Sequence, residues 1–111
     1  MNIPYQSTSP YYNNAEFTVA NATTNYNVAS NQTNLFGGAS SIVSIPYFIR
    51  IMTDQTITVK LNSTDNDAIT ITSSSSPFVL DETIEVQNIF VTNNSGATAN
   101  VKVLTAKPIE K

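Results

Sequence analysis

The sequence predicts an all-β fold, an antiparallel β-sandwich or small jelly roll with an extended N-terminal arm. Apolar and polar side chains alternate along several short runs, which is the period of half-buried strands. Turn-forming residues separate these runs about every ten positions. No long amphipathic helix pattern occurs that would supply the crossovers of a parallel sheet. We therefore expect about seven to nine short strands, with an open Greek-key barrel as the nearest alternative.

The N-terminal part has the weakest strand signals. Residues 1–14 contain prolines and tyrosines but no charged side chain, which predicts an extended arm. The β-sandwich domain is then expected over residues 15–111. Within it, residues 16–20 and 26–29 are expected to form short strands. Residues 31–36 are expected to form a helical turn that ends at the glycine pair following them.

The strand signals become strong in the middle of the chain. Residues 43–51 carry an apolar side chain at every second position, which directs these side chains to one face. Pro46 has no backbone N–H to donate, so this strand is expected at a sheet edge or with a bulge there. Residues 57–61 and 69–71 alternate in the same way on either side of the turn-forming run 62–67. They are predicted to form an antiparallel hairpin.

The last third of the chain predicts a short strand at residues 78–80 and a second hairpin. In residues 83–92 the apolar positions change phase at 87–88, so either both faces are covered or these two residues form a bulge. The Asn-Asn-Ser-Gly sequence at 93–96 provides the positive φ angles of a tight turn before a returning strand at 101–103. The side chains expected in the core are Val59, Ile71, Val86 and Val103.

The composition excludes several classes of function. The chain has no His, Cys or Trp, and Glu16 is the only charged residue before Arg50. Most side chains that perform chemistry near pH 7 are therefore absent, and we expect no enzyme. A net charge of −3 with only five basic residues predicts no nucleic-acid binding. No apolar run approaches the roughly 20 residues of a membrane span and no secretory signal precedes the domain, so a soluble protein is expected.

Carboxylate groups do not form a recognisable catalytic or metal motif. Residues 65–67 read Asp-Asn-Asp, yet they lack the spacing and the distant Glu of a calcium loop, so a plain turn is favoured. Asp81, Glu82 and Glu85 are expected to be solvated at a corner or on an outward face. The sequence therefore predicts no catalytic residue, no metal site and no cofactor.

Tyrosines among asparagines and serines are the candidate partner-binding residues. Tyr adds contact area at a low cost in conformational entropy, and this composition is typical of adaptable binding surfaces. The other interpretation is that these rings only dock the arm onto the domain or its neighbour. The candidates are Tyr5, Tyr11, Tyr12 and Tyr26.

Two segments carry a resemblance to a known group of proteins. Residues 49–71 read IRIMTDQTITVKLNSTDNDAITI and residues 84–104 read IEVQNIFVTNNSGATANVKVL. In its strand pattern, the region from about residue 15 to 105 resembles small β-rich virion structural proteins of tailed bacteriophages. The resemblance is one of style, without a diagnostic motif, so no functional residue is carried over.

This resemblance implies a capsid decoration protein that is made in the host cytoplasm and located on the capsid surface of the virion. Its expected partners are copies of itself, as a homotrimer, and a major capsid protein. The alternative is a receptor- or glycan-binding module of a head fibre or tail. In that alternative, tyrosines and asparagines line shallow sugar sites.

Overall fold

The computed structural model describes residues 11–36, 48–81 and 86–107, which form eight β-strands and one short helix. The all-β prediction is confirmed, and the number of strands lies within the predicted range. The elements are β1 (Tyr11–Val19), β2 (Thr23–Asn27), α1 (Val28–Asn31), β3 (Phe48–Thr53), β4 (Ile57–Leu61), β5 (Ile69–Ile71), β6 (Phe78–Asp81), β7 (Ile89–Asn93) and β8 (Ala99–Lys107).

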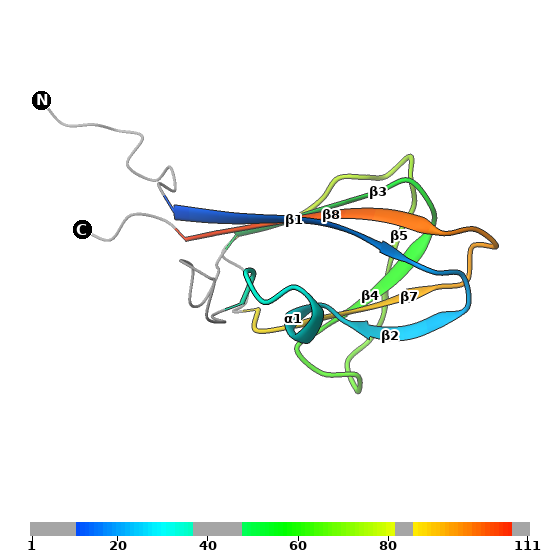
Figure 1. Ribbon diagram of the computed structural model, residues 1–111, viewed down its shortest axis with the longest axis horizontal. Coiled ribbons are helices and arrows are strands. Elements are labelled where there is room, and N and C mark those ends of the chain that lie inside the picture. Colours follow the sequence, from blue (N-terminus) through cyan, green and yellow to red (C-terminus); the bar gives the residue numbers. More distant parts are fainter. Residues whose placement is uncertain (1–10, 37–47, 82–85, 108–111) are drawn as a thin grey trace, which may run out of the picture.

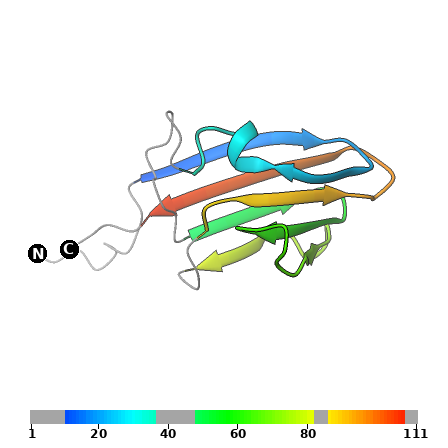
Figure 2. The same cartoon turned by 90° about the horizontal axis from the view of Figure 1, so that it is seen from below.

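The strands form two packed antiparallel sheets with the topology of a jelly roll. Sheet A has the order β1-β8-β3-β6, and sheet B has the order β2-β7-β4-β5 (Figures 1 and 2). Hydrogen-bonded pairs are therefore nested: β1 with β8, β2 with β7, β3 with β6, and β4 with β5. A long hairpin rolled around a core produces this nesting, so the fold is the jelly-roll form of the predicted sandwich.

The predicted second hairpin is wrong. β7 belongs to sheet B and β8 to sheet A, so the turn between them carries the chain across the core. Gly96 does adopt the positive φ, +97°, that the sequence indicated. A local turn signal gives the reversal of direction but not the strand with which the chain then pairs. The first predicted hairpin, β4 with β5, is confirmed.

Of the two alternatives predicted for residues 43–51, the edge strand is wrong for the part that the structure describes, and the bulge at Pro46 falls on residues outside it. β3 pairs with β8 on one side and with β6 on the other, so it is an interior strand of sheet A. Pro46 and the other residues of 43–47 lie outside the described residues. The interior place of β3 results from the rolled topology, which inserts β8 between β1 and β3.

The boundary between arm and domain lies earlier than predicted. β1 begins at Tyr11, and residues 11–14 pair in register with β8 from Lys107 to Leu104. These four residues therefore belong to the sandwich and not to the arm, while residues 1–10 lie outside the described residues. Residues 11–14 lack period-two alternation, so only their partner strand identifies them as a strand.

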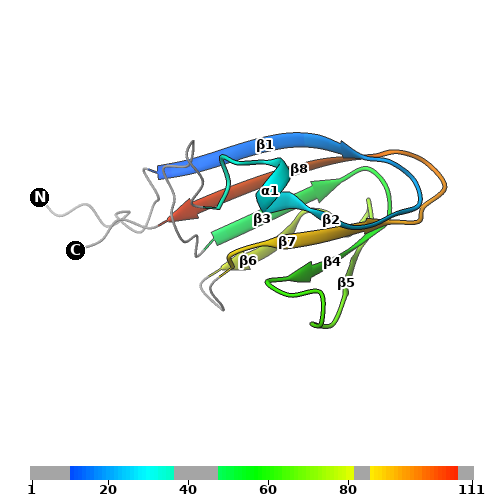
Figure 3. The same cartoon turned by 60° about the horizontal axis from the view of Figure 1, so that its bottom comes forward.

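The helical turn comes earlier than the sequence indicated. The predicted strand at 26–29 ends at Asn27, whose side-chain oxygen accepts a hydrogen bond from the Ser30 amide and caps α1. α1 and residues 32–36 cover the side of the sandwich where β1 and β2 are the edges (Figure 3). Val28 and Leu35 are fully buried there. The Thr105 hydroxyl donates to the Leu35 carbonyl across the same side, at 3.1 Å.

The core lies between the two sheets, as predicted. Val59, Ile71, Val86 and Val103 are each at most 1% exposed. The change of phase near residue 87 has a local cause, because β7 begins only at Ile89 and residues 86–88 are not strand. Because residues 86–88 are not strand, the alternation of β7 begins independently at Ile89. The change of phase therefore does not come from a bulge inside a continuous strand.

Candidate functional site

The two candidate tyrosines whose side chains the structure describes, Tyr12 and Tyr26, lie in different sheets. Tyr26 stacks on Phe17 with ring centroids 5.3 Å apart, and its hydroxyl accepts a hydrogen bond from the Gln32 amide. Since Phe17 lies in sheet A and Tyr26 in sheet B, this ring pair holds the two layers together. Tyr26 is therefore a packing residue in this chain.

Tyr12 is the candidate that remains on the surface. Its side chain is 57% exposed and lies on the outer face of sheet A. Tyr11 pairs with Lys107 at the start of β1, and Tyr5 lies outside the described residues. Tyr12 and Tyr26 are the candidates whose side chains the structure describes, and they lie in different sheets.

Exposed apolar side chains gather on the same outer face of sheet A. Among the described residues, the large hydrophobic side chains with high exposure are Tyr12 at 57%, Val79 at 48% and Met52 at 37%. All three lie in strands of sheet A. In β3, Ile49 and Ile51 are buried, and alternation therefore turns Met52 away from the core.

Strand register brings these side chains onto neighbouring rows of one surface. Tyr12 and Phe48 lie in the same row, one on each side of β8. In the next row, Arg50 lies between Leu104 and Val79. Residues in such rows are near neighbours on one face of a sheet. We define the outer-face patch as Tyr12, Phe48, Met52, Val79 and Leu104.

Polar side chains of both signs border the outer-face patch. Glu16 lies across from Lys102, which in turn lies across from Met52. Arg50 is exposed within the same face, between two patch residues. An exposed apolar group with a polar border is typical of a protein-docking surface.

A hollow of about 390 Å³ opens where this face meets the turn after β3. Two strands and the loop between β5 and β6 supply its walls. We call it the corner hollow. Its lining residues are Met52, Thr53, Asp54, Ser73, Ser76, Asn100 and Lys102.

Asp54 and Asn100 form a fixed polar pair in the corner hollow. The Asn100 amide N–H donates to Asp54 Oδ1 at 2.8 Å, and Asn100 Nδ2 donates to Asp54 Oδ2 at 2.7 Å. The Asp54 N–H also donates to the Asn100 carbonyl at 3.3 Å. Hydrogen bonds to the charged carboxylate, first from the Asn100 side chain and then from its backbone, lower the pKa of Asp54 below 3.8. Asp54 is therefore an anion at neutral pH.

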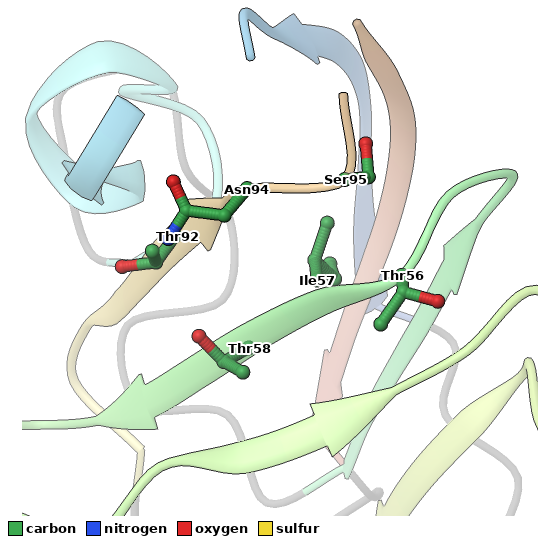
Figure 4. Close-up of a pocket in the computed structure, with 6 residues that line it drawn as sticks. All are labelled: Thr56, Ile57, Thr58, Thr92, Asn94 and Ser95. Atoms are coloured by element: carbon green, nitrogen blue, oxygen red, sulfur yellow. The ribbon is translucent and has the colours of Figure 1, made fainter. Parts of the chain in front are cut away.

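A smaller hollow of about 210 Å³ lies on the side of sheet B (Figure 4). Hydroxyl groups dominate its wall, and Thr58 and Thr92 face each other across β4 and β7. None of the described residues that line it carries a titratable side chain. The lining residues are Thr56, Ile57, Thr58, Thr92, Asn94 and Ser95.

The acidic stretch 65–67 lies in the connection between β4 and β5, as the sequence predicted. Asn66 Nδ2 donates to the Leu61 carbonyl and the Lys60 ammonium donates to the Thr64 carbonyl, so these side chains stabilise the turn. Glu82 and Glu85 lie outside the described residues. Within 11–36, 48–81 and 86–107, no three carboxylate groups are clustered to hold a metal ion.

The chain matches no protein-family model, no curated protein and no solved structure. In the described part, no helix is long and apolar enough to cross a membrane.

Sequence reasoning identified Tyr12 but missed the other members of the outer-face patch. β3 did carry a usable signal. Phe48 and Met52 are apolar, although they occupy the alternate positions that should face solvent. The signal was weaker in β8 and in β6, where Val79 lies in an unbroken apolar run. Only the order of the strands brings these positions onto one surface.

Proposed function

We propose that this chain is a non-enzymatic capsid decoration protein that assembles with copies of itself through the outer-face patch. The observation that carries the proposal is the concentration of exposed large apolar side chains on the outer face of sheet A. Burying such side chains against a neighbour removes apolar area from water, and this is the main favourable term in association.

The low charge of the chain supports self-assembly. Charged residues make up 12% of the sequence and the net charge is −3, so copies repel one another weakly. The outer-face patch lies beside both Glu16 and Lys102, which allows a neighbour to pair charges at its border. A second copy of the chain offers the same apolar and polar groups.

The virion context rests on two further supports. Jelly rolls are a common architecture of viral capsid proteins, although they also occur in lectins and other proteins. The segments at 49–71 and 84–104 resemble small virion proteins of tailed phages. Under this proposal, the protein binds a capsid surface as a homotrimer and reinforces the shell by mass action.

The solution mass of the purified protein tests the self-assembly part of the proposal. Light scattering is expected to give a trimer for the unchanged chain and a monomer for the double variant Tyr12→Ser and Val79→Ser. The control, Thr58→Ser and Thr70→Ser, changes the outer face of sheet B and should leave the trimer intact. A monomer for the unchanged chain at every concentration, or a trimer for the folded patch variant, would overturn the proposal.

Immunogold labelling tests the capsid location, using particles of the virus that encodes the chain under this proposal. Gold distributed over the head surface is expected. Gold confined to the tail, or particles without label, would contradict a decoration role even if the protein is a trimer in solution.

A further inference from the structure

We propose that the corner hollow is a binding site for a neutral saccharide. The site is distinct in its ligand, but its lining shares Met52 with the outer-face patch and Lys102 with the border of that patch. The inference rests on the arrangement of donors, acceptors and one apolar side chain around the hollow.

The floor of the corner hollow is formed by outward side chains of two neighbouring strands. Met52 lies across from Lys102 in the ladder between β3 and β8. Asp54 and Asn100 continue that arrangement past the end of β3, joined by the hydrogen bonds described above. An apolar side chain, an ammonium, a carboxylate and an amide therefore lie within one small area.

The wall of the corner hollow is held in place by hydrogen bonds. Ser76 Oγ accepts from the Thr53 amide at 3.1 Å and ties the β5–β6 loop to the end of β3. Within the loop, the Thr72 amide donates to Ser75 Oγ at 2.9 Å and the Ser75 amide donates to Thr72 Oγ1 at 3.0 Å. A wall that is already ordered reduces the entropy cost of ligand binding.

The polar groups keep capacity for a ligand. A carboxylate accepts about four hydrogen bonds, and the two from Asn100 use one position on each oxygen of Asp54. The Lys102 ammonium has three donors, and the Asn100 side chain also offers a carbonyl oxygen. The hollow thus presents a fixed acceptor and a cationic donor on adjacent strands.

The balance of charge selects the chemical class of ligand. An anion would meet the ionised Asp54, and an organic cation would meet Lys102. Among the described lining residues, a metal ion would find one carboxylate, and an apolar ligand would leave both charged groups desolvated without partners. A sugar hydroxyl both donates and accepts, so adjacent hydroxyls fit Asp54 and Lys102 together, while Met52 contacts the apolar C–H face of the ring.

The size of the corner hollow agrees with this class of ligand. Its volume of about 390 Å³ lies in the ordinary range of ligand sites, roughly 300–1,000 Å³.

Amide chemical-shift titration of the full chain with glucose, galactose, mannose and N-acetylglucosamine tests the proposal. At least one sugar is expected to shift the amides of Asp54, Ser76, Asn100 and Lys102 in a saturable manner. The absence of saturable shifts for all four sugars, or shifts confined to the hollow on sheet B, would overturn the site. Stronger binding of inorganic phosphate at the same amides would overturn the neutral ligand class.

Two matched variants make the assignment specific. Lys102→Met keeps the length of the side chain but removes the donor, and it should weaken sugar binding by about tenfold, as expected for one hydrogen bond to a charged group. Lys60→Met makes the same change on sheet B and should leave the affinity unchanged. Equal effects of both variants would contradict the proposed site, whatever the oligomeric state of the protein.

Discussion

At the residue scale, the buried amide of Asn93 organises one end of the sandwich. Its Nδ2 donates to the carbonyls of Val19 and Ala97, both at 2.8 Å, and its Oδ1 accepts from the Ser95 amide. The side chain is fully buried, and it links the β1–β2 and β7–β8 connections. In the described residues, every buried side-chain nitrogen or oxygen has a hydrogen-bond partner, so this core tolerates polar groups only when they are paired.

Replacement of Asn93 by Ala is expected to lower the free energy of unfolding by about 3 kcal/mol, because two backbone carbonyls lose their donor near the core. Urea denaturation followed by circular dichroism measures this change. The control Asn94→Ala removes an exposed neighbour and should change stability by less than about 0.5 kcal/mol. Similar losses for the two variants would show that the buried amide has no special role.

The Asp54 carboxyl provides a second test at the residue scale. Because Asn100 stabilises the charged form, the pKa of Asp54 should lie below 3.8, and Asn100→Ala should raise it towards that value. A carboxylate with a lowered folded-state pKa contributes stability above its unfolded pKa and loses that contribution as the pH falls through its folded pKa. Carbon-detected NMR titration of the side chain measures both values. An unchanged pKa in Asn100→Ala would contradict the assigned cause.

At the scale of elements, alternation determines which face of each strand is buried. β4 shows this most clearly, with Ile57, Val59 and Leu61 inward and Thr58 and Lys60 outward. β3 alternates equally well, but its outward positions include Phe48 and Met52, two residues of the outer-face patch. Apolar side chains at the outward positions of an otherwise regular strand therefore indicate an interaction surface.

Val59→Asp is expected to cost more than about 4 kcal/mol, because it places an unpaired carboxylate in the fully buried centre of β4. Thermal unfolding and solubility measure the effect. Thr70→Asp makes a comparable change at an exposed position of β5 and should leave the fold stable. Normal stability of Val59→Asp would contradict the register of sheet B.

At the scale of the whole molecule, the jelly roll joins the first described strand to the last. β1 pairs along its full length with β8, so β1 holds the last strand of the sandwich in place. α1 and residues 32–36 close the adjacent side through the buried side chains of Val28 and Leu35. The outer-face patch is a product of the same wrapping, since it combines β1, β8, β3 and β6.

Two N-terminal deletions test the revised boundary of the sandwich. Removal of residues 1–10 preserves every described strand pair, so the fold should remain stable while association weakens if this segment reaches a neighbour. Removal of residues 1–14 also takes four positions of β1 and should cost about 2–4 kcal/mol, at about 1 kcal/mol for each lost ladder hydrogen bond. Thermal unfolding and light scattering separate the two effects. Equal stability of both deletions would contradict the boundary at Tyr11.

The sequence by itself determined the all-β class, the first hairpin and the buried positions, because these depend on side-chain period and local turn chemistry. Val59, Ile71, Val86 and Val103 were predicted from alternation alone, and all are buried. The partners of β3, β7 and β8 were decided only by the tertiary structure, because strand pairing depends on contacts between residues far apart in the chain. The outer-face patch and the corner hollow belong to that second group. Each combines side chains from several segments, and no local pattern records which strands become neighbours.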